Sequence, residues 1–373
     1  MAGIYLHIPF CKKRCIYCDF FSTTCKEQKT AYIRALCHEL TDRKDYLKGE
    51  PIETIYLGGG TPSQLAKEDF EAIFSHIYKV YKVTPNAEIT LEANPDDLTS
   101  EYISMLRTFP FNRISMGIQT FQETTLKQLQ RRHTADQAIR AFQGCRTAGF
   151  QNISIDLMYG LPGETLTSWK KDLKQALSLH PEHISAYHLI YEEGTPLWKL
   201  HKVEEADEDL SVSLFGTLID ELTTAGYEHY EISNFCLPGL HSRHNSSYWT
   251  EKQYLGCGPS AHSYNGISRQ WNVASLDKYI EGISSGNPTF EVEELDLYTR
   301  YNDFVITHIR TQWGMPLPKL GKQYGEELYK YCLRMATPHL QQGTLEIKND
   351  TLKLTRKGVF ISDGIMSDML WVE

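Results

Sequence analysis

Short apolar runs alternate with longer stretches of helical periodicity over the first two-thirds of the chain. The apolar runs predict strands at residues 4–8, 54–57, 88–92, 113–118, 153–158 and 183–187. Apolar residues at helical spacing predict helices between them, at residues 31–45, 68–81, 100–108, 135–148 and 166–179. Alternating strands and helices are typical of βα units and a parallel sheet. Six units are too few for a closed eight-stranded barrel, so the pattern predicts an α/β fold with an open, partial barrel of about six parallel strands.

The pattern changes near residues 194–196, and the rest of the chain predicts an extension and a small appendage. Residues 231–272 are loop-like and rich in His, Asn, Gly, Tyr and Trp. In the last block, two short strands flank Asn349 and Asp350, a typical turn pair, and helices surround them. This combination resembles a winged helix. The predicted division is a partial barrel at 1–200, a barrel-closing segment at 201–295 and a C-terminal domain at 296–373.

Composition and charge narrow the classes of function. The chain of 373 residues is 41% hydrophobic and 23% charged, which is typical of a globular protein. Its 38 Lys and Arg residues against 47 Asp and Glu residues give a net charge of −9, which argues against a nucleic-acid partner. No apolar run reaches the ~20 residues that span a bilayer, and the first residues resemble a strand rather than a signal peptide. Nine unevenly spaced cysteines do not suit a disulfide framework, so we expect a reducing cytoplasm.

Three of the cysteines have the spacing of a metal centre. Cys11, Cys15 and Cys18 form the pattern C-x3-C-x2-C, so that three thiolates can surround one compact group. A [4Fe–4S] cluster ordinarily takes four cysteines, and three would leave one iron open to an exchangeable ligand. A zinc ion with Cys25 or a histidine as fourth ligand is the alternative. Three buried or reactive thiols without a metal are the remaining possibility.

Glycines and polar residues stand where the predicted strands end. A glycine run, residues 58–60, follows the second strand, and Glu92, Gln119 and Asp156 come at the ends of the third, fourth and fifth. Parallel βα folds place their ligand-binding groups at the carboxyl ends of the strands. We therefore expect these residues and the cysteine loop to meet on one face.

These motifs together resemble the radical SAM superfamily. The segment YLHIPFC, residues 5–11, is similar to the oxygen-independent coproporphyrinogen III oxidase group, and the resemblance covers nearly the whole chain. It implies that the three cysteines hold a [4Fe–4S] cluster whose fourth iron chelates S-adenosylmethionine (SAM). The residues implied to contact SAM or the cluster pocket are Tyr5, Gly59, Gly60, Thr61, Glu92, Gln119, Arg131 and Asp156.

The resemblance also suggests individual roles within this set. The glycine segment matches one that meets the amino group of SAM, and Asp156 matches a residue near the ribose. Arg131 matches an arginine that neutralises the carboxylate of SAM, a pairing that suits the guanidinium group. Its neighbour Arg132 is the alternative for the same role.

Two features separate this chain from the oxidases and resemble the haem-chaperone branch of the group, often called HemW. The oxidases carry a fourth cysteine two positions after the third, where this chain has Phe20. Residues 244–249, HNSSYW, resemble the H-N-x-x-Y-W motif of the chaperone branch. A haem iron takes axial imidazole, and His244 is the predicted ligand. The other candidate ligands are His241, His262 and Cys257. Cys257 matches a variable position of the family's glycine segment and is interpreted as a spectator.

The first hypothesis is a haem chaperone that binds haem and a SAM-ligated cluster and transfers haem to an acceptor protein. The acceptor is unidentified, with a respiratory or membrane-associated protein as the expected kind, and a homodimer is left open. The alternative is a radical SAM coproporphyrinogen III dehydrogenase that oxidatively decarboxylates propionates. A zinc-bound scaffold without redox activity is the third hypothesis. The carrier is favoured over a turnover enzyme, and no catalytic residue is assigned.

Overall fold

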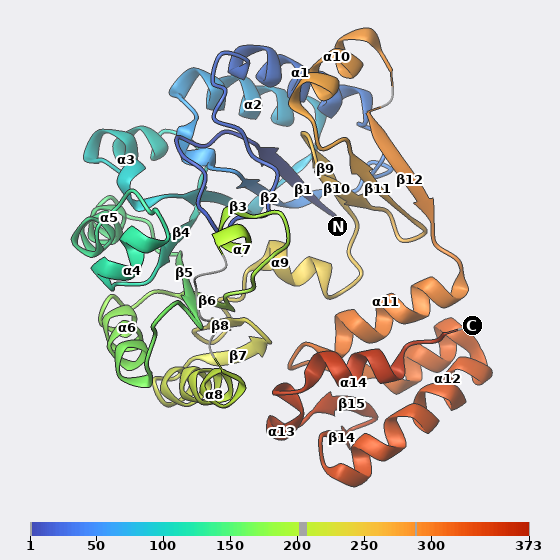
Figure 1. Ribbon diagram of the computed structural model, residues 1–373. Coiled ribbons are helices and arrows are strands. Elements are labelled where there is room, and N and C mark those ends of the chain that lie inside the picture. Colours follow the sequence, from blue (N-terminus) through green and yellow to red (C-terminus); the bar gives the residue numbers. More distant parts are fainter. Residues whose placement is uncertain (1, 201–206, 288, 373) are drawn as a thin grey trace.

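The molecule is built around one large sheet (Figure 1). In the middle of this sheet, six parallel strands lie side by side in chain order. The computed structural model describes residues 2–200, 207–287 and 289–372. All six predicted strands are confirmed, and each pairs in parallel with the next. They are β1 (Ala2–Ile8), β2 (Ile52–Gly59), β3 (Val83–Ala93), β4 (Arg113–Gln119), β5 (Ile153–Tyr159) and β6 (His183–His188).

Helices follow the strands and cover the outer face of the curved sheet (Figure 1). The predicted helices are confirmed as α1 (Lys29–Asp42), α2 (Lys67–Val80), α3 (Ser100–Leu106), α5 (Ala135–Thr147) and α6 (Leu166–Ser178). Thr134 and Thr165 begin α5 and α6 with capping boxes, which satisfy backbone N–H groups of the first turn. Three further helices are α4 (Glu123–Gln128), α7 (Pro196–Leu200) and α8 (Glu208–Thr224).

The sheet continues beyond the six predicted strands on both sides. β9 (Tyr254–Cys257) pairs in parallel with β1, and β10 (His262–Tyr264), β11 (Ser268–Asn272) and β12 (Phe290–Glu294) extend it antiparallel. Beyond β6 lie β8 (Asn234–Cys236) and β7 (Glu228–Glu231). α9 (Arg243–Tyr248) and α10 (Leu276–Ser285) complete this part. Within the described residues β12 and β7 are the two open edges of the sheet, so the partial barrel is confirmed.

The last part of the chain has a hydrophobic core of its own. Its elements are α11 (Leu297–Ile309), β13 (Met315–Pro316), α12 (Leu317–Gln342), β14 (Leu345–Lys348), β15 (Thr351–Leu354), α13 (Arg356–Val359) and α14 (Ser362–Met369). The predicted hairpin is β14–β15, and Asn349 and Asp350 form its turn with φ values of 52° and 55°. Helices around a three-stranded sheet agree with the winged-helix-like appendage.

The predicted domain boundaries fall at two different kinds of position. Asp296, the first residue of the predicted C-terminal domain, is the N-cap of α11. The predicted boundary between residues 200 and 201 adjoins 201–206, which lie outside the described residues. Among the helices that the structure describes, none combines the length and the apolar character needed to cross a bilayer.

Candidate functional site

A cavity of about 380 Å³ opens at the carboxyl ends of the parallel strands. The cysteine loop between β1 and α1 forms one wall, and residues at the ends of β2 to β6 form most of the rest, with Arg131 and Asn245 added from outside the strands. The predicted site residues that line it are Cys11, Cys15, Cys18, Gly59, Gly60, Thr61, Glu92, Gln119, Arg131 and Asp156. Residues up to 145 positions apart, from 11 to 156, therefore meet on one face, as expected for groups at the carboxyl ends of parallel strands.

The cysteine loop is fixed at its base and at its tip. At the base, the Thr23 amide donates to the Pro9 carbonyl at 2.7 Å, and the Cys11 amide donates to the Thr23 carbonyl at 2.8 Å. At the tip, the Leu197 amide of α7 donates to the Ile16 carbonyl at 2.8 Å, and both side chains share a small apolar cluster. Backbone pairing and apolar packing thus hold the loop beside the strand ends.

The spread of the three cysteine sulfurs distinguishes a cluster from a single ion. Among the described residues, three ligand atoms lie within 4.8 Å of one another only at Glu228, Cys236 and His241. At least one pair of the three loop sulfurs is therefore more than 4.8 Å apart, beyond the ~3.8 Å expected between two sulfurs on one tetrahedral zinc ion. A cubane whose irons occupy separate corners suits this wider triangle. The donor set fits a [4Fe–4S] cluster, as the sequence predicted.

Cys25 is not placed to be the fourth ligand of the zinc alternative. Cys25 is exposed, and its thiol donates to Glu27 Oε2 at 3.1 Å outside the cavity lining. Burial raises the pKa of Cys18 to about 11 and also raises the pKa of Cys11, because it disfavours the thiolate. A cationic metal centre supplies the positive charge that the thiolates need.

Two partly buried carboxyl groups face the cavity. Glu92 accepts hydrogen bonds from the Tyr56 hydroxyl at 2.7 Å and from the Gly59 amide at 3.1 Å. Burial raises the pKa of Glu92 to about 7, with nearby Asp156 adding to the shift. Burial also raises the pKa of Asp156, whose carboxylate accepts from the Ser115 hydroxyl at 3.2 Å. These groups provide acceptors for a polar or cationic ligand.

Arg131 and Arg132 face different surroundings. Arg131 Nη2 donates to Asn94 Oδ1 at 2.7 Å, and its Nη1 lies 3.3 Å from the sulfur of Cys15. Arg132 instead forms ion pairs with Asp96 at 2.8 Å and Asp97 at 3.2 Å. Arg131 lines the cavity, and its Nε is buried without a protein hydrogen-bond partner. Of the two arginines, Arg131 is therefore positioned for a ligand.

Tight backbone approaches explain the glycines and Gln119. A Cβ atom on Gly60 would lie 2.8 Å from the carbonyl oxygens of Ile8 and Pro9, so the end of β2 passes close to β1. Gln119 has a φ of 71°, which is strained for a residue other than glycine, at a shift in the pairing of β4 with β5. Such strain is common at binding sites. Thr61 donates its hydroxyl hydrogen to the sulfur of Cys11 at 3.3 Å.

Tyr5 and His244 are not part of the cavity lining. The Tyr5 ring stacks on Tyr56, with centroids 6.1 Å apart. His244 is 1% exposed, and its Nδ1 and Nε2 lie 2.8 Å from Thr54 Oγ1 and 2.9 Å from the Tyr248 hydroxyl. Burial lowers the pKa of His244 to about 3, so the ring is neutral. Both nitrogens are engaged, and this position does not support the predicted iron ligation by His244.

Sequence reasoning missed several residues of the cavity. Asn94, Ser115, Tyr187 and Asn245 line it. Asn245 belongs to the HNSSYW segment, so this segment reaches the cavity through its asparagine rather than through its histidine. Of the other candidate iron ligands, Cys257 is buried on β9 and His262 is exposed on β10, and both lie outside the cavity lining.

The partial barrel and its three-cysteine cavity define a radical SAM protein. The sequence profile of the Radical SAM superfamily matches residues 5–176, and that of the HemN C-terminal domain matches residues 295–361. The chain is 31% identical to "Heme chaperone HemW" of Bacillus subtilis over 99% of both chains. It is 32% identical to the protein of the same name from Mycobacterium tuberculosis, over 99% of this chain and 94% of that one. The chain belongs to the HemW family.

A solved structure confirms the architecture. Coproporphyrinogen III oxidase (HemN) from Escherichia coli superposes on this chain with a TM-score of 0.88. The superposition covers 99% of this chain and 89% of the oxidase, at 22% identity. At this sequence identity, the similarity between the two structures shows a shared fold and nothing more.

Proposed function

We propose that the protein is a haem chaperone that holds haem and passes it to an acceptor protein. Curated relatives named haem chaperones match nearly the full length of the chain, which favours this function over porphyrinogen decarboxylation. Within the structure, the proposal rests on the presence of Phe20 in the cavity lining. Phe20 is 63% exposed and lines the cavity at the position where the oxidase pattern has a further cysteine.

The cavity would hold the cofactors, with Cys11, Cys15 and Cys18 binding a [4Fe–4S] cluster. When bound, that cluster supplies an iron to which SAM can attach. On the protein side, Arg131 would pair with the carboxylate of SAM, while Glu92 and Asp156 accept hydrogen bonds from its amino and hydroxyl groups. Gly59, Gly60 and Thr61 let the end of β2 approach the ligand closely. Tyr5 supports this wall through its stacking on Tyr56, which lines the cavity.

Haem would lie across the mouth of this cavity as cargo. Haem has flat apolar faces and two anionic propionates. Phe20 and Tyr187, the latter 44% exposed, offer aromatic surfaces, and Lys13 and Arg14 on the same lining offer cations for the propionates. An apolar surface beside cations matches both parts of the haem molecule.

A haem titration of the cluster-loaded protein tests this placement. We expect a sharpened Soret band on haem binding, and Phe20→Ser and Arg14→Gln should each weaken binding about tenfold. Tyr78→Ser is the matched control, because Tyr78 is an exposed aromatic residue on α2 outside the cavity. Equal haem affinity in Phe20→Ser, Arg14→Gln and wild type would contradict the placement at the cavity mouth.

A turnover assay separates the chaperone from the alternative dehydrogenase. The protein is incubated with coproporphyrinogen III, SAM and a reductant, and the porphyrin products are measured. We expect haem transfer to an acceptor without multiple turnovers of decarboxylation. Repeated decarboxylation would establish the dehydrogenase function instead.

We also propose a cytoplasmic location. All nine cysteines, each of them within the described residues, are free, as is typical of a reducing compartment. A respiratory or membrane-associated acceptor and a homodimer stay predictions of the sequence.

A further inference from the structure

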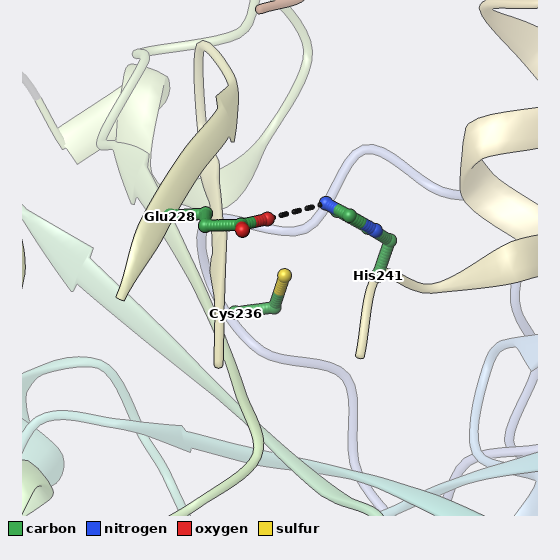
Figure 2. A group of neighbouring side chains, drawn as sticks. All are labelled: Glu228, Cys236 and His241. Atoms are coloured by element: carbon green, nitrogen blue, oxygen red, sulfur yellow. Dashed lines mark ion pairs between the residues drawn. The ribbon is translucent and has the colours of Figure 1, made fainter. Parts of the chain in front are cut away.

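A second group of metal-ligating side chains meets at the β7 edge of the sheet (Figure 2). Glu228 comes from β7, Cys236 from β8 and His241 from the segment that precedes α9. Their ligand atoms all lie within 4.8 Å of one another, and none of the three residues lines the cysteine cavity. We propose that this cluster binds a divalent metal ion of the zinc type.

The donor atoms suit such an ion. His241 Nε2 lies 2.9 Å from Glu228 Oε2, and the Cys236 sulfur points toward the space beside this pair (Figure 2). Zinc binds thiolate, imidazole and carboxylate together, whereas calcium and magnesium prefer oxygen ligands alone. A thiolate and a carboxylate with a neutral imidazole carry two negative charges, which balance a divalent cation. Three protein ligands leave the fourth position of a tetrahedral ion to water.

The site is closed on one side and accessible on the other. Cys236 is completely buried, while the side chains of His241 and Glu228 are 24% and 36% exposed, so an ion can enter from their side. The His241 ring is held by edge contacts to Tyr230 and Trp313, with centroids 4.8 and 5.4 Å away. Aromatic packing therefore fixes the imidazole before an ion binds.

Ion binding requires loss of the thiol proton. Burial raises the pKa of Cys236 to about 12, so this thiol is protonated without a metal. On binding, a metal–sulfur bond forms and the proton passes to solvent, while the metal keeps its oxidation state. A haem iron fits this cluster poorly although His241 was a candidate haem ligand. Haem leaves only its two opposite axial positions free, whereas three donors here converge on one point.

The position of the cluster indicates a structural clamp. Cys236 and Glu228 belong to the hairpin at the edge of the sheet, and His241 immediately precedes Ser242, the N-cap of α9. Trp313, from the segment between α11 and β13, packs on the same imidazole. One ion would therefore fasten the sheet edge to α9, beside the contact with the C-terminal domain.

Zinc binding to the full-length, cluster-loaded protein tests the proposal, because occupied loop cysteines cannot then take up the added ion. After zinc addition and desalting, we expect one zinc per chain beside the cluster iron, and a higher melting temperature. Cobalt should give a thiolate-to-metal charge-transfer band in the difference spectrum. Cys236→Ser should abolish this band, and His241→Gln and Glu228→Gln, which change partly exposed residues, should each weaken binding at least about tenfold.

Matched variants control for unspecific effects. Cys332→Ser changes another fully buried cysteine, and His262→Gln changes an exposed histidine on β10, so both should keep the zinc and the cobalt band. Retention of zinc and of the band in Cys236→Ser, or a zinc-free wild type with an intact cluster, would overturn the proposal. Haem titration is independent of this result, so the clamp can fail while the chaperone function stands.

Discussion

At the scale of single residues, neighbours in the chain have different roles because they face different partners. Arg131 reaches Asn94 and Cys15 at the cavity, whereas Arg132 is neutralised by Asp96 and Asp97. A guanidinium group already paired with two carboxylates has little left to offer a ligand. The residue type alone left both arginines open as the partner of SAM.

Substitution of Arg131 and substitution of Arg132 should therefore have different effects on the affinity for SAM. We expect Arg131→Gln to weaken SAM binding about 10- to 100-fold, because a charged hydrogen-bonding partner contributes about 1.5–3 kcal/mol. Arg132→Gln is the matched control and should keep SAM affinity close to wild type. Equilibrium dialysis of the cluster-loaded variants measures both. The assignment fails if Arg132→Gln shows the larger loss.

The raised pKa of Glu92 predicts that SAM binding depends on pH. With a pKa of about 7, this carboxyl is mainly protonated at pH 6 and mainly ionised at pH 8. An ionised carboxylate is the stronger acceptor, so SAM should bind about fivefold more tightly at pH 8 than at pH 6.

Glu92→Gln separates this effect from other titrations of the cavity. Its SAM affinity should be weaker at pH 8 and should vary less between pH 6 and pH 8 than that of wild type. The same pH dependence in wild type and variant would show that another group, such as Asp156, is responsible.

At the scale of elements, α9 connects the sheet interior to the cavity. The amides of Arg243 and His244 both donate to the Glu88 carboxylate of β3 at 3.0 Å, which satisfies the free N–H groups at the helix start. The His244 ring forms one hydrogen bond with Thr54 of β2 and another with Tyr248 of the same helix. These contacts fix a six-residue helix that is too short to be stable alone.

The position of His244 predicts a structural effect of its removal. We expect His244→Ala to lower the free energy of unfolding by about 2–3 kcal/mol, because it leaves a cavity and two buried hydroxyl groups without a partner. His262→Ala, at an exposed position, should change it by at most about 0.5 kcal/mol. Denaturant unfolding measures both, and haem titration of the folded fraction should give wild-type affinity. Loss of the Soret band without loss of stability would instead support iron ligation by His244.

At the scale of the whole molecule, the C-terminal domain is joined to the β7 edge of the sheet. The backbone N–H of Gln312 donates to the Tyr230 carbonyl at 2.9 Å, and Arg310 Nη2 lies 2.7 Å from the buried Glu231 carboxylate. The Arg310 guanidinium also lies over the Trp249 ring, 4.2 Å from its centroid. Barrel, HNSSYW segment and C-terminal domain therefore meet at one arginine.

Removal of this arginine should destabilise the molecule. We expect Arg310→Met to lower the free energy of unfolding by about 2 kcal/mol, because it leaves the Glu231 carboxylate buried without its cation. Adding Glu231→Gln should recover part of this loss. Thermal unfolding of the single and double variants tests the coupling. Purely additive losses would contradict it.

Much of the fold and of the cysteine cavity follows from the sequence. The βα units are encoded locally, since apolar periodicity and caps such as Thr134 and Thr165 act over a few residues. The cysteine motif is contiguous. Glu92 and Asp156 were expected on the same face because the carboxyl ends of parallel strands share one edge of the sheet. Local signals and one general rule of parallel folds were sufficient for these features.

The tertiary structure alone decided the features that depend on distant partners. Strands β9 to β12 are short, and their pairing is set by neighbours rather than by a pattern of their own. The inward position of His244 depends on Thr54 and Glu88, which lie more than 150 positions earlier. Glu228, Cys236 and His241 have no motif spacing and meet only because the β7–β8 hairpin folds beside α9. The sequence determines the chemistry of each side chain, but the packing of the whole chain determines which groups surround it.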